Sequence, residues 1–376
     1  MKSMLITGGA GFIGTHLAAE AIKAGYVVKI IDNLSPQIHG TEASYKPNPE
    51  AEFVKGDVTS RQDMQNSLDG VDIVVHLAAE TGTGQSMYEI ERYYGVNVQA
   101  TALLFDILAN HRHRVSKVIL ASSRSVYGEG AYLCRNCSAE GKRCFPSPRS
   151  PEQLASHDWE PRCTTCQGTV TPTATREDDK LAPASIYAAT KLAQEDLVRI
   201  GCSSLGISHA ILRFQNVYGE GQSLSNPYTG ILSIFSTRIR LGLPLPIFED
   251  GHETRDFVHV QDIANAVIRC AEGEMPSGHV VNAGMGKPTS IMAVAQLLCR
   301  LMDSSIEPHV SAQYRVGDIR HNFADISRLQ NIVGFTPEVS LEQGMARFCQ
   351  WVSTQPVPQD LLDKANAELK ARKMMG

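Results

Sequence analysis

Three side chains of the sequence could act together on a hydroxyl or carbonyl group. Tyr187 and Lys191 stand four residues apart at the start of a predicted helix, so both lie on one helical face. A nearby ammonium favours phenolate, which predicts a pKa for Tyr187 below its usual value of about 10. Ser123 ends a predicted buried strand, where its hydroxyl either hydrogen-bonds a reacting oxygen or caps the strand. A Tyr-x-x-x-Lys pair alone is common, but all three together are far more specific.

A glycine-rich turn early in the sequence has the spacing of a dinucleotide-binding loop. Residues 8–14 read GGAGFIG and satisfy both G-x-G-x-x-G and G-x-x-G-x-x-G. The turn follows a predicted strand and opens a predicted helix, whose free N–H groups can bind a pyrophosphate. Asp32 ends the next predicted strand, where its carboxylate can accept a hydrogen bond from a ribose 2′-hydroxyl and repel a 2′-phosphate. This pattern predicts NAD as the cofactor, unless Asp32 is only a turn residue.

A cluster of cysteines has the spacing of a zinc site. Cys134 and Cys137 form one C-x₂-C pair and Cys163 and Cys166 form a second, separated by somewhat more than the usual ribbon spacing of about 15–20 residues. Two such pairs supply four thiolates, which complete a tetrahedral zinc site with no open position. The segment has too little apolar content for its own core, so the metal would supply folding free energy. We therefore expect one structural zinc, with disulfides or a redox switch involving Cys144 as the alternatives.

These chemical groups are connected by an alternation of short apolar segments and helical patterns. The predicted strands cover residues 4–7, 27–31, 51–54, 73–76, 118–121 and 210–213, and the predicted helices cover residues 12–24, 61–68, 92–110 and 186–201. A strand–helix–strand order with right-handed crossovers produces a parallel sheet. The predicted fold class is α/β, with a doubly wound Rossmann sheet of six strands. Ligands bind at the carboxyl edge of such a sheet.

Two regions break the alternation. Residues 131–172 are rich in Cys, Pro, Ser, Thr and Arg with little periodicity, which predicts a zinc-ribbon-like insert. We expect a NAD-binding domain over 1–219, to which a strand and helix near 254–275 return, and a smaller mixed substrate domain formed by 220–253 and 276–352. Residues 353–376, with a helical pattern over 361–370, are expected to form a peripheral tail.

The overall composition is that of an ordinary globular protein. The 376 residues are 43% hydrophobic and carry a formal net charge of −5. This slightly acidic balance gives no reason to expect nucleic acid or an anionic membrane as a partner. No run of about 18 apolar residues and no signal-peptide pattern is present, so the expected location is the cytoplasm.

Several segments together resemble the extended short-chain dehydrogenase/reductase family, in particular its nucleotide-sugar epimerases. The resembling segments are residues 8–14, 56–58, 77–79, 123–128, 187–191, 213–219 and 255–260, and the resemblance runs from residue 1 to about 350 apart from the insert. It implies that Tyr187 is the catalytic acid and base, that Lys191 binds the nicotinamide ribose, and that Ser123 orients the reacting oxygen.

The resemblance also implies which residues hold the ligands. For NAD they are Gly8, Gly11, Phe12, Ile13, Gly14, Asp32, Asn33, Asp57, Val58, Leu77, Ala78, Ala79, Asn97, Ser122, Tyr187 and Lys191. For a nucleotide-diphosphate sugar they are Thr81, Ser123, Arg124, Asn216, Arg255 and Arg315. Arginine suits a diphosphate because its guanidinium is planar and always charged, although an ordinary ion pair is the alternative for Arg255 and Arg315. A homodimer through the helices at 92–110 and 186–201 is implied as well, although their apolar faces could equally pack on the sheet.

The resemblance implies 4-epimerisation, by transient oxidation at C4 and re-reduction on the other face. Related 4,6-dehydratases have an Asp-Glu pair directly after the hydroxyl residue, where this chain has Arg124 and Ser125. Arg124 cannot act as a general acid at neutral pH, so dehydration is not expected. Residues 317–325 and the insert look most like dTDP-L-rhamnose 4-epimerases. A UDP-sugar epimerase, a uronate decarboxylase, a dehydratase and a non-catalytic NAD-sensing protein stay open as alternatives.

Overall fold

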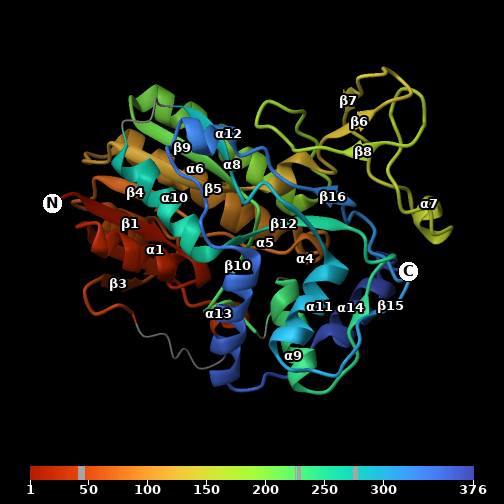
Figure 1. Ribbon diagram of the computed structural model, residues 1–376. Helices are drawn as coiled ribbons and strands as arrows, with labels where there is room; N and C mark the ends of the chain where they lie inside the picture. Colours follow the sequence, from red (N-terminus) through yellow and green to blue (C-terminus); the bar gives the residue numbers. More distant parts are fainter. Residues whose placement is uncertain (41–46, 225, 227–229, 274–277) are drawn as a thin grey trace.

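A seven-stranded, fully parallel sheet forms the centre of the computed structural model, which describes residues 1–40, 47–224, 226, 230–273 and 278–376 (Figure 1). In spatial order its strands are β3 (Glu52–Lys55), β2 (Val27–Asp32), β1 (Ser3–Thr7), β4 (Ile73–His76), β5 (Lys117–Ser123), β9 (Ser208–Phe214) and β13 (His279–Ala283). The chain runs outward from β1 in one direction and then outward from β4 in the other. This order confirms the predicted doubly wound α/β fold.

The sheet has one strand more than the six that the sequence predicts. β13 pairs with β9, with His279 opposite Ala210, although residues 276–352 were assigned to the smaller domain. The strand is short, and it contains a buried Asn282 whose amide donates to the carbonyl oxygens of Thr175 and Asp325. A buried polar residue with local partners interrupts the apolar pattern from which strands are predicted. The boundary placed at 275–276 lies outside the described residues.

Helices cover both faces of the sheet. On one face lie α1 (Phe12–Lys23), α10 (Val260–Glu272) and α12 (Ser327–Asn331), and on the other lie α3 (Arg61–Leu68), α6 (Ala100–Asn110) and α8 (Ile186–Leu205). Their apolar stripes bury side chains such as Leu17 and Val267 on the first face and Leu104 and Val198 on the second. The single helix predicted over 92–110 is divided into α5 (Ile90–Tyr93), a π-helical segment (Tyr94–Gln99) and α6. Within the described residues, no helix is both long and apolar enough to span a membrane.

A smaller unit stands beside the carboxyl edge of the sheet. Its helices α9 (Ile231–Arg240), α11 (Ile291–Leu301) and α13 (Leu341–Thr354) surround a separate apolar cluster that includes Phe235, Leu298 and Phe348. Its short strands are β10 (Asn216–Tyr218), β12 (Thr254–His259), β14 (Pro288–Ser290) and β16 (His321–Asn322), with β11 (Pro246–Ile247) paired to β15 (His309–Val310). β12 continues directly into α10, which packs on the large sheet, so this strand and helix join the two units.

Two further segments complete the chain. The insert carries a small antiparallel sheet of β6 (Tyr132–Cys134), β7 (Lys142–Cys144) and β8 (Thr171–Pro172), together with α7 (Pro151–Ala155), and it projects from the body at the upper right of Figure 1. The tail forms α14 (Leu362–Ala371) close to the predicted position. It was expected to be peripheral, but Leu362, Leu369 and Met375 are buried. The tail is therefore packed against the body of the protein.

Candidate active site

One continuous pocket extends from the carboxyl edge of the large sheet to the smaller unit. The predicted residues that line it are Gly8, Gly11, Phe12, Ile13, Gly14, Asp32, Asn33, Val58, Leu77, Ala78, Ala79, Thr81, Ser122, Ser123, Arg124, Tyr187, Lys191, Asn216, Arg255 and Arg315. Asp57 and Asn97 stand behind the lining. Asp57 accepts a hydrogen bond from Asn33, and the buried Asn97 donates to the hydroxyl of Thr190. The structure thus brings both predicted ligand sets into one cavity.

Two glycines of the turn have no room for a Cβ atom. Gly8 has a φ of +67°, and a Cβ placed on it would lie 2.9 Å from the backbone of Ala78. A Cβ on Gly14 would lie 2.5 Å from the Cα of Gly9. Helix α1 begins after Gly11, and no side chain in the described part of the chain caps its first N–H groups. These donors at the pocket wall fit the pyrophosphate of a dinucleotide.

Asp32 is held at the end of β2, in the wall of the pocket. One carboxylate oxygen accepts from the backbone N–H of Ala10 at 3.1 Å and the other accepts from Leu34 at 2.9 Å. The ring of His39 lies 3.6 Å from the same carboxylate. Asp32 therefore holds a carboxylate in a fixed position against the glycine turn.

The charge of Asp32 predicts how the cofactor is selected. We expect Asp32→Ser to lower the ratio of the NADP Kd to the NAD Kd by about tenfold or more, because the repulsive carboxylate is removed. Titration of both dinucleotides into the purified variant measures this ratio. Asp69→Asn is a suitable control, since Asp69 is exposed at the end of α3. An unchanged ratio in Asp32→Ser would show that Asp32 does not face the ribose.

The structure places Ser123, Tyr187 and Lys191 next to one another. Ser123 is the last residue of β5, and Tyr187 lies in the first turn of α8, which Ser185 caps by accepting from the N–H of Ala188. The Ser123 hydroxyl, which accepts from the N–H of Ser125 at 3.2 Å, is near enough to the Tyr187 phenol to influence its pKa. The ammonium of Lys191 donates to the carbonyl oxygen of Ala121 at 3.0 Å and lies 6.0 Å from the centroid of the Tyr187 ring.

The electrostatics of this group differ from the sequence-based prediction. Burial raises the pKa of Tyr187 above its ordinary value, and the nearby Ser123 hydroxyl and the charge of Arg124 only partly oppose this effect. The predicted lowering by Lys191 is therefore wrong. Burial removes water from the Lys191 ammonium and lowers its pKa to about 7, so the cation that acts on the phenol is Arg124.

Three arginines face the part of the pocket next to the catalytic group. Arg124 donates to the side-chain oxygen of Asn216 at 2.9 Å, and burial together with repulsion from Arg255 lowers its pKa to about 9. Arg255 donates to the carbonyl oxygens of residues 254, 319 and 320. Arg315 lies over the ring of Phe248 at 4.9 Å. Among the described residues none of the three has a carboxylate within ion-pair distance, so the alternative of an ordinary ion pair does not apply to Arg255 and Arg315.

Ser122, one of the predicted NAD-binding residues, lines the pocket, but its hydroxyl is already used within the protein. It donates to Glu195, which forms a buried ion pair with Arg213 at 2.7 Å.

Some residues of the site were not predicted from the sequence. Phe248 and Leu362 also line the pocket. Asp318 stands in the segment that begins at Arg315, so the position of that arginine could have indicated it. No sequence pattern connects Phe248 or Leu362 with the site.

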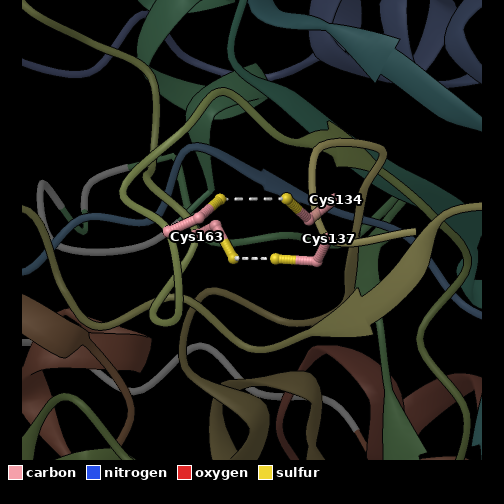
Figure 2. Close-up of side chains that lie close together, drawn as sticks. Cys134, Cys137 and Cys163 are labelled. Atoms are coloured by element: carbon pink, nitrogen blue, oxygen red, sulfur yellow. Dashed lines mark hydrogen bonds between the residues drawn. The ribbon is translucent and has the colours of Figure 1, made fainter. Parts of the chain in front are cut away.

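The four paired cysteines of the insert converge on one point. Figure 2 shows the sulfurs of Cys134, Cys137 and Cys163 turned toward one another, and the four sulfurs, including that of Cys166, all lie within 4.8 Å of each other. The Sγ atoms of Cys134 and Cys166 are 3.5 Å apart, and those of Cys137 and Cys163 are 3.7 Å apart. Tetrahedral zinc with Zn–S bonds of about 2.3 Å requires sulfur separations of about 3.8 Å. This donor set therefore fits a tetrahedral thiolate-bound metal.

Residues 4–151 and 162–284 match the family described as "NAD dependent epimerase/dehydratase family". The chain belongs to this family. Residues 152–161, which separate the two matched ranges, lie within the insert. Membership of this epimerase/dehydratase family confirms the predicted relation to extended short-chain dehydrogenases/reductases and the expectation of an NAD-dependent enzyme.

Individual members of the epimerase/dehydratase family are similar over nearly the whole chain. The dTDP-L-rhamnose 4-epimerase of Burkholderia thailandensis is 38% identical over 360 residues, which is 94% of this chain and 96% of the relative. The UDP-glucose 4-epimerase of Thermotoga maritima, solved with UDP-glucose, superposes with a TM-score of 0.75 at 27% identity, over 93% of this chain and 98% of its own. The UDP-glucuronic acid 4-epimerase of Bacillus cereus, solved with UDP-glucuronic acid and NAD, has a TM-score of 0.74 at 25% identity, over 93% and 99%.

Proposed function

We propose that the protein is an NAD-dependent nucleotide-sugar 4-epimerase, with dTDP-L-rhamnose as the first candidate substrate. The observation that carries this proposal is the pocket that joins Ser123 and Tyr187 to three arginines which, among the described residues, have no carboxylate within ion-pair distance. Cations in a pocket favour an anionic ligand, and a nucleotide-linked sugar carries two phosphates. Similarity to the Burkholderia enzyme supports the choice of sugar.

In this proposal the large sheet binds the cofactor and the smaller unit binds the diphosphate of the substrate. The glycine turn, Asp32 and the edge of the large sheet hold NAD, which supplies a hydride acceptor and later a hydride donor. Arg255 and Arg315 bind the diphosphate from the smaller unit, and this places the sugar against Ser123 and Tyr187. We keep the expected division into a NAD-binding and a sugar-binding domain as part of this proposal, although β13 and α12, within the range 276–352 assigned to the sugar-binding domain, pack with the large sheet.

Tyr187 performs the proton transfers in this proposal. Tyr187 would take up the proton of the C4 hydroxyl as C4 is oxidised and would return it to the same oxygen as C4 is reduced on the opposite face, and bound NAD would accept and return the hydride. Ser123 donates a hydrogen bond to the reacting oxygen. Lys191, held by the carbonyl of Ala121, is placed to bind the nicotinamide ribose. The sugar changes configuration at C4 with no net oxidation.

The residues after Ser123 argue against dehydration. Arg124 is half-buried near Tyr187 and stays cationic at neutral pH, because its pKa is lowered only to about 9. The hydroxyl of Ser125 has no hydrogen-bond partner in the described part of the protein, but it is neither an acid nor a base near neutral pH. An elimination across C5 and C6 would require a proton donor and acceptor that these two positions lack.

The reaction itself provides the test. Incubated with dTDP- and UDP-linked sugars without added reductant, the enzyme is expected to form the C4 epimer of at least one, with dTDP-L-rhamnose converted fastest. A substrate deuterated at C4 should keep its label in the product, because the hydride returns to the same carbon. Mass spectrometry of the product measures the label. Loss of deuterium to solvent, or a requirement for added NADH, would contradict the mechanism.

We further propose that Cys134, Cys137, Cys163 and Cys166 bind one structural zinc. The backbone N–H of Thr165 donates to the Cys163 sulfur at 3.4 Å, and a hydrogen bond of this kind favours the thiolate. A thiolate is the form that binds zinc. All nine cysteines are without a disulfide, which suits a reducing compartment such as the cytoplasm.

A homodimer remains our proposal for the assembly. The helices expected to form it present apolar side chains to the outside: Ile200 of α8 is 59% exposed and Tyr94 of the π-helical segment is 41% exposed. The sheet-facing sides of the same helices are already buried. Their outer apolar residues are therefore available for a second copy of the chain.

A further inference from the structure

The tail contributes directly to the arginine side of the pocket. Asn366, in the middle of α14, is 8% exposed, and its side-chain oxygen accepts from an Nη of Arg315 at 3.1 Å. Leu362, one turn earlier in the same helix, lines the pocket itself. The helix therefore forms part of the wall that surrounds the guanidinium.

Arg315 keeps hydrogen-bonding capacity that the protein does not use. Its Nε is buried and has no partner among the described residues, and one face of its guanidinium lies over Phe248. Asn366 is a neutral acceptor, so it fixes the guanidinium without cancelling its charge. A guanidinium fixed in this way can present its remaining N–H groups to phosphate oxygens with little loss of side-chain entropy.

The chain that follows Asn366 is fixed to two other segments. After α14 the chain pairs with the segment that carries Arg315: the N–H of Tyr314 donates to Gly376, and the N–H of Val316 donates to Met374. On the side of the large sheet, the Arg372 guanidinium lies 4.1 Å from the ring centroid of Tyr88. These contacts fix the distance between Asn366 and Arg315 before any ligand binds.

We propose that Asn366 is a positioning residue that holds Arg315 in the orientation required to bind the diphosphate of the substrate. This inference rests on the proposed function, and it assigns the tail a part in substrate affinity. Asn366 acts through Arg315 and makes no contact with the sugar. It should therefore influence the binding of any nucleoside diphosphate, and it should leave NAD binding unchanged.

Two substitutions at position 366 separate positioning from packing. Asn366→Asp keeps the shape of the side chain but pairs ionically with Arg315, so the carboxylate competes with the phosphates. Asn366→Ala removes the acceptor and leaves the guanidinium free to rotate. If Asn366 only packs, the alanine variant should bind the diphosphate like the wild type. If it positions Arg315, both variants should bind the diphosphate more weakly than the wild type, and the loss in the alanine variant should depend on the presence of Arg315.

Calorimetric titration of dTDP and UDP into the NAD-loaded enzyme tests the proposal. Asn366→Ala is expected to raise the Kd of the nucleotide by about fivefold, the usual effect of one neutral hydrogen bond, and Asn366→Asp by more. In an Arg315→Ala background, Asn366→Ala should cause no further loss, because both changes remove the same interaction. Lys364→Ala, on the exposed face of the same helix, is the matched control and should bind like the wild type. The Kd of NAD should stay within about twofold in every variant.

The outcomes distinguish this inference from the proposed function. Wild-type affinity in Asn366→Ala or in Asn366→Asp, or additive losses in the double variant, would overturn the positioning role. The aspartate variant gives this answer even if the alanine variant does not fold, since it preserves the side-chain shape. Failure of the wild type to bind either dTDP or UDP would overturn both the proposed function and the role of Asn366.

Discussion

Tyr187→Phe is expected to lower kcat by about 10²–10⁴-fold, the usual contribution of a positioned acid–base group. The change removes one hydroxyl, and the ring continues to fill the space beside Ser123. Neither proton transfer at the C4 oxygen then has a donor or an acceptor. NAD binding should be unchanged, because the glycine turn and Asp32 are not altered. Steady-state turnover of the best nucleotide sugar, together with NAD titration, measures both effects.

The control for this variant is another tyrosine that loses the same atom. Tyr26→Phe is suitable because Tyr26, between α1 and β2, does not line the pocket. Its kcat should match the wild type within about twofold. Turnover close to the wild type in Tyr187→Phe would exclude Tyr187 as the acid–base residue.

Loss of the metal is expected to have the second large effect, on stability. Protein purified without added zinc should contain about one zinc per chain, and Cys163→Ser should lose most of it. Structural zinc sites contribute about 10–16 kcal/mol of apparent binding free energy, and the insert has only a small apolar cluster around Tyr132 to replace it. We therefore expect the insert of Cys163→Ser to unfold locally and to be cut by proteases between residues 131 and 172. Metal analysis and limited proteolysis measure the two consequences.

Cys144 offers the matched control for the zinc prediction. It is buried next to the four paired cysteines but is not one of the converging set. Cys144→Ser should retain zinc and resist proteolysis, whereas Cys163→Ser should do neither. A metal-free wild-type protein with an ordered insert, or a disulfide between Cys134 and Cys166, would contradict the zinc site.

The sequence predicted those parts of the site that depend on local geometry. Ser123 and the glycine turn each follow a strand of one parallel sheet, and parallel strands end at the same edge. Tyr187 and Lys191 share one face of a single helix, so their spacing alone brings them together. For these residues, knowledge of the elements was enough to place the side chains, because the fold brings the ends of the elements to one edge.

Other parts could not be predicted because they depend on contacts between distant segments. The pKa of Tyr187 follows from its burial and from Arg124, and neither effect is visible in the spacing of Tyr187 and Lys191. Asn366 meets Arg315 through the packing of the tail, which has no motif. β13 was missed because the hydrogen bonds that satisfy Asn282 come from other segments of the chain.

The position of the insert affects how the active site assembles during folding. Ser123 precedes the insert and Tyr187 follows it, so their contact must close a loop that contains the whole insert. The entropy cost of closing a loop grows with its length, by about 0.6 kcal/mol for each doubling. A metal that joins Cys134 to Cys166 shortens the flexible chain between the two catalytic residues to the segments on either side of the cluster. Zinc supply during synthesis would then determine how quickly new chains acquire a complete catalytic group, although the metal lies outside the pocket.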